Sequence, residues 1–259
     1  MIKGSQTRIT LFLWCIAALT PVTTMAGLID GSQLHIAGDA QVGATALNWH
    51  CNLPGDTGCA TAAANQGDLS VTGSTGSFAQ YNGTFGLITD INNAAQPLNT
   101  PFSLPNFITF QLNNDITIEL TFIPLGTNTA STTCAGLTHC TPQNGLLVTP
   151  TNPAGLSAFN LDQNANGTSA TFGVRGVVHS SDGSTADLNG IFSAEFAGLD
   201  PEQTLAAAVG GSNSTYSSNM NLILNVIPTP EPATSLITGI GLVSLALLGK
   251  RIGRSRNLK

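Results

Sequence analysis

Hydrophobic and polar residues alternate along much of the chain, which is the pattern of β-strands with one buried and one exposed face. The clearest runs cover residues 116–122, 170–178, 186–196 and 220–226. Shorter candidate strands cover 34–37, 41–47, 69–71, 76–80, 84–89 and 107–111. Roughly ten short strands are typical of a β-sandwich or jelly roll, so the pattern predicts a single all-β domain.

Turn residues separate the later strands. Asn166-Gly167 and Asp182-Gly183 are dipeptides that favour tight hairpin turns, because both residues tolerate left-handed backbone geometry. They predict a meander of antiparallel strands over residues 156–196.

One helix is predicted after the meander. Asp200 is suited to the N-cap, Pro201 to the first helical position and Gln203 to the position that closes a capping box. Residues 204–209 would follow as a short helix that stops at Gly210, and we expect it to lie across one end of the strands.

The N-terminal segment has the layout of a secretory signal peptide. Lys3 and Arg8 precede an apolar stretch over 9–19, and a small-residue cleavage site ends at Ala26. Signal peptidase is therefore expected to cut between Ala26 and Gly27. Residues 1–26 would then be absent from the mature protein.

A second long apolar run lies near the C-terminus, over residues 233–249. As a helix it would be about 25 Å long, which is close to the minimum for crossing a bilayer. A basic stop follows the run and places the C-terminus in the cytoplasm by the positive-inside rule; it consists of Lys250, Arg251 and Arg254. A buried core helix is the alternative, but the run is apolar on every side rather than amphipathic.

The residues before this run are Pro230-Glu231-Pro232. This motif, followed by one hydrophobic span and a short basic end, resembles the PEP-CTERM sorting signal, and the resemblance is confined to the C-terminal tail. It implies that an exosortase cuts near the motif after transient anchoring in the inner membrane, and that the protein ends at the cell surface or in an exopolysaccharide-containing matrix. Thr229 stands where valine is frequent in such tails. The expected organisation is a signal peptide over 1–26, a β-sandwich ectodomain over 27–227 and a sorting signal over 228–259.

Charge is distributed unevenly. Between residues 27 and 229 the only Lys or Arg is Arg175, whereas all acidic residues except Glu231 lie in this region. An acidic domain repels nucleic acid, so binding of DNA or RNA is not expected. Absence of lysine from this region also leaves no amine for Schiff-base chemistry. Solubility outside the cell is the simplest explanation of the acidic surface.

Four cysteines remain after signal cleavage, in two local pairs. We expect disulfides between Cys51 and Cys59 and between Cys134 and Cys140, as is usual for an exported protein. The alternative is a metal site that these cysteines form with His50 and His139. Neither pair has the two-to-four-residue separation of a zinc site.

One string resembles a ligand site. Residues 162–167 have the form D-x-N-x-N-G, in which Asp162, Asn164 and Asn166 could supply oxygens to calcium. Gly173 stands where the EF-hand pattern requires a glutamate, so a hairpin turn is the preferred explanation. The sequence contains no G-x-S-x-G, H-E-x-x-H or Walker motif.

These observations favour an exported surface or matrix protein with a structural or interaction role, no catalytic residues and no required cofactor. The first alternative is a module that binds calcium or polysaccharide. Against a sugar platform, the aromatic residues other than phenylalanine in the expected mature chain are only Trp49, Tyr81 and Tyr216. The second alternative is an extracellular hydrolase, for which the scattered acids neither provide nor exclude a facing pair.

Overall fold

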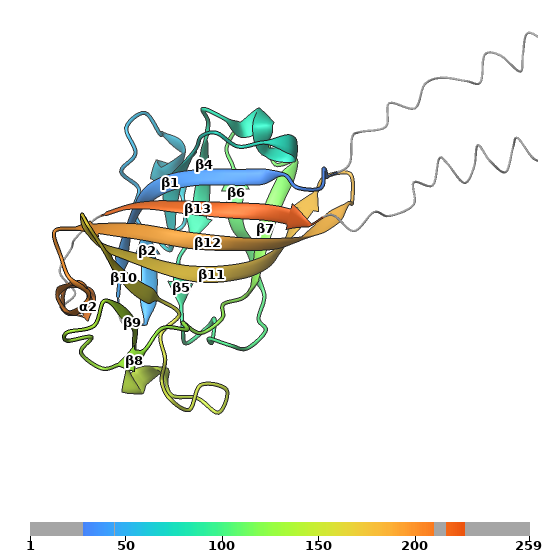
Figure 1. Cartoon of the computed structure of the whole chain (residues 1–259). Coiled ribbons are helices and arrows are strands. Elements are labelled where there is room, and N and C mark those ends of the chain that lie inside the picture. Colours follow the sequence, from blue (N-terminus) through green and yellow to red (C-terminus); the bar gives the residue numbers. More distant parts are fainter. Residues whose placement is uncertain (1–27, 44, 210–215, 226–259) are drawn as a thin grey trace, which may run out of the picture. The chain divides into compact units, whose positions relative to one another are not determined.

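The computed structural model describes residues 28–43, 45–209 and, for the backbone, 216–225. In this part of the chain nearly all regular structure is β-strand, and one α-helix is present (Figure 1). The all-β class with one short helix is therefore confirmed. Residues of the predicted signal peptide, the Ala26–Gly27 cleavage site and the sorting signal lie outside the described residues.

Eight strands form a closed ring, and each is hydrogen-bonded to the next in antiparallel fashion. The ring runs in the order β12 (Thr185–Ala197), β13 (Tyr216–Asn225), β1 (Gln33–Val42), β3 (Gln66–Val71), β4 (Phe85–Thr89), β6 (Leu104–Phe110), β7 (Ile116–Phe122) and β11 (Gly167–Ser180). Pairing of β11 with β12 completes it (Figure 1).

This closure corrects the predicted sandwich or jelly roll, in which two sheets would pack face to face. The strands belong to one continuous sheet that curves until its first and last members pair. Alternation of apolar and polar residues shows that each strand has one buried face, but a sandwich and a closed ring both enclose a buried apolar interior. The pattern therefore cannot distinguish them.

Three further strands form a side branch on β11, namely β10 (Asn160–Asn164), β9 (His139–Pro142) and β8 (Ala130–Ser131). The first residues of β11, 167–171, pair with β10, whereas 175–180 pair with β7. The change of partner coincides with a register shift between Arg175 and Gly176. A Cβ at Gly176 would collide with the backbone oxygen of Glu119, so glycine permits this close approach.

Two short strands complete the sheet beside β1. They are β2 (Ala46–Trp49), which pairs with β1, and β5 (Ile91–Asn92), which pairs with β2. β1 is continuous through Val42, where the sequence had suggested two strands over 34–37 and 41–47.

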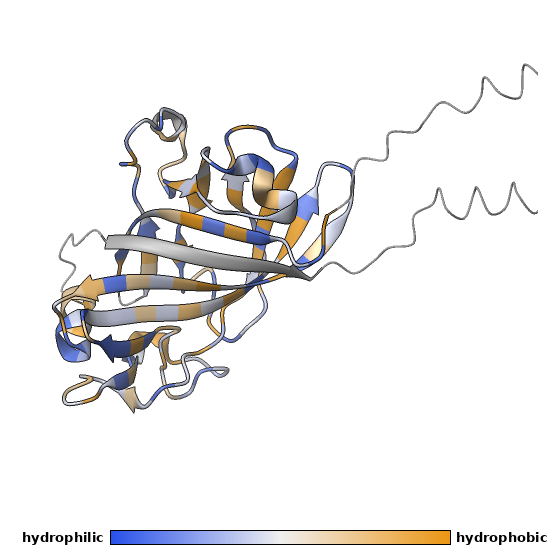
Figure 2. Cartoon of the chain, turned by 45° about the horizontal axis from the view of Figure 1, so that its top comes forward, coloured by the Kyte–Doolittle hydropathy of each residue, from blue (hydrophilic) through white to orange (hydrophobic). Residues whose placement is uncertain are grey.

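The core fills the interior of the ring. Buried and more exposed residues alternate strictly along β1 and most of β11, and apolar and polar bands follow one another along the strands in Figure 2. Tyr81 and Phe110 stack with their ring centroids 3.9 Å apart, and both are fully buried. Burial of such large aromatic surfaces supplies much of the driving force for folding.

The predicted strand over 76–80 is wrong. This segment is the 3-10 helix η2 (Gly76–Tyr81), which buries Phe78 and Tyr81. These two residues are three positions apart, which places them on one side of a helix with three residues per turn. The same two large residues would point to opposite faces of a strand. The other two 3-10 helices are η1 (Gly58–Thr61) and η3 (Gly145–Leu147).

The predicted helix is present as α2 (Pro201–Val209). Its capping box forms in both directions, because the backbone N–H of Gln203 donates to Asp200 Oδ1 at 2.8 Å and the backbone N–H of Asp200 donates to Gln203 Oε1 at 3.1 Å. α2 contacts β9 and β10 of the side branch. Among the described residues, no helix is both long and apolar enough to cross a membrane.

Candidate functional site

The candidate calcium residues lie on the hairpin between β10 and β11. Asp162 Oδ1 accepts a hydrogen bond from Asn128 Nδ2 at 2.8 Å and lies 2.7 Å from His139 Nδ1. Asn164 Oδ1 accepts the backbone N–H of Asn166 at 2.8 Å. Asp162 Oδ1 and Asn164 Oδ1 are therefore already engaged within the fold.

The hairpin turn between β10 and β11 explains the residue types at 162–167. Asn164 pairs with Gly167, so Ala165 and Asn166 form a two-residue hairpin loop. Gly167 has φ of +145°, and a Cβ there would collide with the backbone oxygen of Phe196. A glycine is required at this position by the backbone. The hairpin interpretation of 162–167 therefore accounts for Asn164, which accepts the backbone N–H of Asn166, and for Gly167.

Both predicted disulfides are present. Cys51 is bonded to Cys59 and Cys134 to Cys140, with Cα separations of 5.6 and 5.7 Å. A disulfide sulfur carries no thiolate charge, so these cysteines do not offer the ligands that zinc requires.

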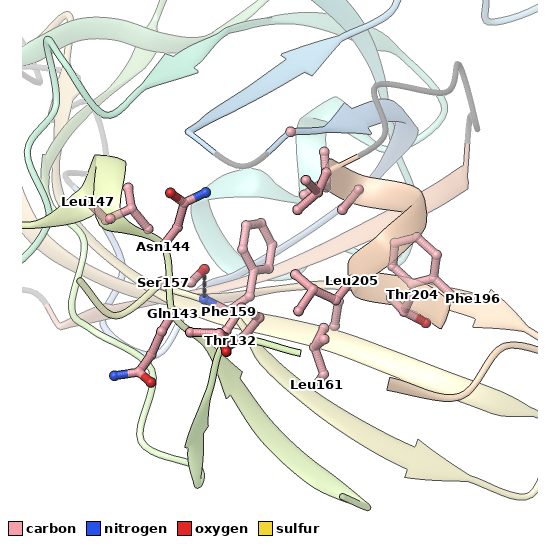
Figure 3. Close-up of a pocket in the computed structure, with 17 residues that line it drawn as sticks. Thr132, Gln143, Asn144, Leu147, Ser157, Phe159, Leu161, Phe196, Thr204 and Leu205 are labelled. Carbon is pink, nitrogen blue, oxygen red and sulfur yellow. Dashed lines mark hydrogen bonds between the residues drawn. The ribbon is translucent and has the colours of Figure 1, made fainter. Parts of the chain in front are cut away.

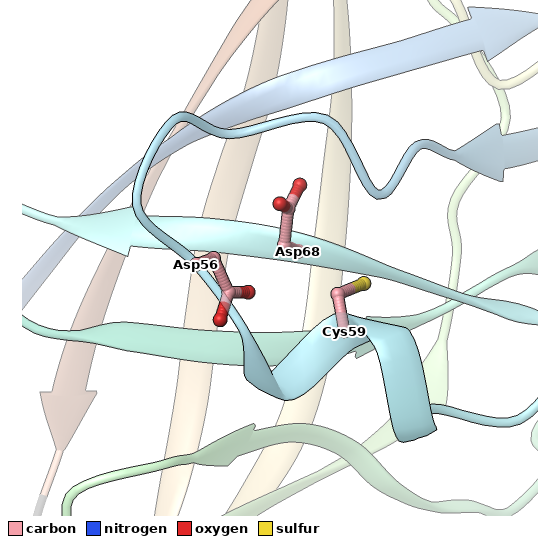
Figure 4. Close-up of side chains that lie close together, drawn as sticks. All are labelled: Asp56, Cys59 and Asp68. Atoms are coloured by element: carbon pink, nitrogen blue, oxygen red, sulfur yellow. The ribbon is translucent and has the colours of Figure 1, made fainter.

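The same reasoning applies to a cluster of Asp56, Cys59 and Asp68, the group of potential metal ligands that the described residues bring together (Figure 4). Asp68 accepts the backbone N–H groups of Asn52 at 3.3 Å and Leu53 at 2.7 Å, one on each oxygen. These bonds favour the ionised form, but burial outweighs them and raises the pKa of Asp68. The cluster fixes the Cys51–Cys59 loop against β3 and needs no ion to explain it.

Two histidines have acidic partners on neighbouring strands. His139 on β9 contacts Asp162 on β10, and both side chains are substantially exposed. His179 Nε2 on β11 lies 3.1 Å from Glu119 Oε2 on β7. A hydrogen bond from Ser103, together with His179, lowers the pKa of Glu119. These are surface cross-strand pairs, and each is explained by strand pairing.

Trp49 and Tyr81, named above as potential sugar-stacking residues, lie in the core. Trp49 is 6% exposed and Tyr81 is 0% exposed. Neither presents a ring face to solvent, so neither contributes to a carbohydrate platform. The Tyr81 hydroxyl donates to Asn113 Oδ1 at 2.9 Å, and burial raises its pKa to about 12.

A pocket of about 290 Å³ lies between α2, the side branch and the end of β1 (Figure 3). Its apolar lining comes from several separated segments, and the members are Val42, Pro142, Leu147, Phe159, Leu161, Ala170, Phe196, Leu205, Ala208 and Val209. The polar side chains are Thr132, Gln143, Asn144, Ser157 and Thr204. None of the described lining residues is charged.

The polar groups of the pocket are mostly committed to the fold. Ser157 Oγ accepts the backbone N–H of Phe159 at 3.1 Å, and Asn144 Oδ1 accepts that of Leu146 at 2.9 Å. Thr204 is 1% exposed, and its hydroxyl has no hydrogen-bond partner among the described residues. The pocket is thus an apolar space with amides at one side.

Sequence reasoning expected α2 to close one end of the fold, but it did not identify this pocket. Its wall combines the η3 segment, β10, β11, β12 and α2 with the end of β1, which is far from the others in the chain. The local signal that could have indicated it is the apolar pair Leu205 and Val209, four residues apart on one helix face.

Comparison with known proteins yields no assignment: no family model matches the chain, and neither the curated proteins nor the solved structures contain a match.

Proposed function

We propose that this chain is an exported protein, sorted to the cell surface or extracellular matrix by an exosortase, whose β domain has a structural or interaction role without catalysis. The observation that carries the proposal is the pair of local disulfides, each joining cysteines less than ten residues apart. Such bonds persist in an oxidising compartment and are rare in the cytosol.

The two ends of the sequence support the same destination. A signal peptide that ends at Ala26 would deliver the chain across the membrane, and Pro230-Glu231-Pro232 before an apolar run would present it to the exosortase. The inner membrane would hold the protein only until cleavage. The acidic, non-catalytic domain would then lie in a matrix that contains exopolysaccharide.

Intact mass spectrometry of the unreduced protein from its own host tests this proposal. We expect a chain that begins at Gly27, ends near Pro230 to Pro232 and is lighter by four hydrogens than the reduced form. In the variant Glu231→Ala the tail should be retained, while Asp30→Ala, an equivalent acid removal inside the domain, should be processed normally.

A chain that still carries Lys259 in the wild type would overturn exosortase sorting. Export itself would be overturned by an unreduced chain that still begins at Met1 and whose mass shows that neither disulfide has formed.

A further inference from the structure

The pocket beside α2 has the size and lining of a small-molecule site. Its volume of about 290 Å³ is near the lower end of typical ligand pockets. Water in an apolar space finds few hydrogen-bond partners. Replacement of that water by an apolar ligand is therefore favourable.

Apolar surface continues from the pocket onto the outside of the protein. Leu146 is 78% exposed, Val148 54% and Val209 57%, and these are half of the strongly exposed large apolar residues in the described part of the chain. Val209 lines the pocket, and the other two flank Leu147, which also lines it. Exposed apolar residues next to lining residues indicate a binding surface more than scattered ones do.

Charge restricts the class of ligand. No described lining residue is charged, and the one basic side chain of the domain, Arg175, is placed over the ring of Phe122 at 5.3 Å. The pocket has no cation to receive a carboxylate or phosphate, and the acidic domain repels anions. The described lining also has no carboxylate to receive a cation, so a neutral ligand fits it best.

The polar side chains of the lining indicate where a polar group of the ligand would lie. Gln143 and Asn144 are half-buried, and the fold engages one end of each amide: Gln143 Nε2 donates to Ala154 O at 3.2 Å, and Asn144 Oδ1 accepts the backbone N–H of Leu146 at 2.9 Å. Among the described residues this leaves Gln143 Oε1 and Asn144 Nδ2 for a ligand. The inner wall is formed by aliphatic and aromatic groups such as Leu161, Phe159 and Leu205 (Figure 3). A ligand with one polar end and an apolar body matches this division.

We infer that the pocket binds a neutral amphiphile with about ten carbon atoms, such as a medium-chain alcohol or its ester, with the alkyl body against α2 and β10 and the polar end near Gln143 and Asn144. This binding activity goes beyond the proposed surface role. It does not depend on how either end of the chain is processed.

Photolabelling tests the inference on the protein as the host produces it. The probe is a decanol analogue with a diazirine in its alkyl chain, and labelled residues are mapped by mass spectrometry. We expect labels on α2 and β10, and we expect excess unlabelled 1-decanol to prevent them. The corresponding decanoate probe should label these segments more weakly.

Two substitutions on the same helix provide the matched comparison. Ala208→Phe fills the pocket, whereas Ala206→Phe adds the same ring at an exposed position outside the lining. If Ala208→Phe displaces about two methylene groups of ligand from contact, labelling should fall by at least about ten-fold. Ala206→Phe should label like the wild type.

Equal labelling of wild type and Ala208→Phe would overturn the inference, as would labels that 1-decanol does not displace. If Ala208→Phe fails to fold, displacement by 1-decanol in the wild type and the positions of the labels still decide the question. Equal labelling by the decanoate probe would overturn the restriction to neutral ligands.

Discussion

The indole ring of Trp49 meets the ring of Phe192 edge to face, with centroids 5.1 Å apart. Phe192 also contacts Phe172 at 4.8 Å, and Phe172 contacts Phe159 at 5.0 Å. Since Phe159 lines the pocket, a continuous row of four aromatic rings joins the pocket wall to the core. Edge-to-face pairs of this kind add to the stabilisation from buried area.

Phe192→Ala should remove the centre of this row. Phe192 is 0% exposed, so we expect a loss of about 3 to 5 kcal/mol in the free energy of unfolding. Urea denaturation followed by fluorescence measures the change. The adjacent Ile191, which is 58% exposed on the same strand, is the control, and Ile191→Ala should change stability by less than about 0.5 kcal/mol. Similar losses in the free energy of unfolding for both variants would contradict a special contribution of the four aromatic rings to stability.

Asp90→Asn should alter how stability depends on pH. Burial raises the pKa of Asp90 above its ordinary value of 3.8, so the folded protein holds this proton more tightly than the unfolded chain. Its contribution to stability is then fully present below pH 3.8 and is lost as pH rises through the folded pKa. Melting temperatures of the variant should exceed those of the wild type by more at neutral pH than in acid.

Asp68→Asn is the matched contrast for that experiment. Asp68 also has a raised pKa, but each of its oxygens accepts a backbone N–H, whereas a single bond, from Trp49 N to Asp90 Oδ1 at 2.7 Å, holds Asp90. An asparagine side chain at this position would have only one acceptor oxygen. Its NH2 group would face one of the two backbone N–H donors, and two donors cannot bond to each other. We therefore expect a loss of about 1 to 3 kcal/mol in the free energy of unfolding at neutral pH. Stabilisation by Asp68→Asn would contradict this account.

Thr204→Val should raise the melting temperature. The buried hydroxyl of Thr204 has no partner among the described residues, and valine has the same shape without the polar atom. Removal of an unsatisfied buried hydroxyl should gain about 1 kcal/mol or more. Thr204→Ser, which keeps the hydroxyl and loses the methyl group, should be destabilising. A lower melting temperature for Thr204→Val would show that the hydroxyl is bonded in solution.

The two disulfides should differ in their reduction by a mild thiol. Cys51 is exposed, whereas Cys134 and Cys140 are each 0% exposed. Because the attacking thiolate must reach a sulfur atom, Cys51–Cys59 should open first. Alkylation during reduction, followed by peptide mapping, gives the order. Faster opening of Cys134–Cys140 would indicate that its surroundings open readily. Each bond should contribute about 2 to 3 kcal/mol to stability.

Features that depend on residues close together in the sequence were predicted correctly. The alternation over 116–122 gave β7 with its exact bounds, and Asp200 with Gln203 predicted a capping box that forms as expected. Asp182-Gly183 predicted a turn, which Gly183 makes with φ of +85°. The cysteine pairs were predicted because each joins residues close in sequence.

Features that depend on distant segments were not predicted. Closure of the ring requires β13 to pair with both β1 and β12, and no periodicity within one strand encodes its partners. The helix η2 was mistaken for a strand because the predicted range, 76–80, stopped before Tyr81, whose spacing of three from Phe78 indicates a 3-10 helix. The pocket was missed because its wall is assembled from residues between Val42 and Val209.

β11 belongs to two assemblies, since residues 167–171 hold the side branch and 175–180 complete the ring. The pairings that close the ring, those of 175–180 with β7 and of β11 with β12, do not involve the branch. Separation of β10 from β11 would break five residue pairings and leave the ring closed. A local opening that separates β10 from β11 would therefore cost less free energy than global unfolding, because the pairings that close the ring remain.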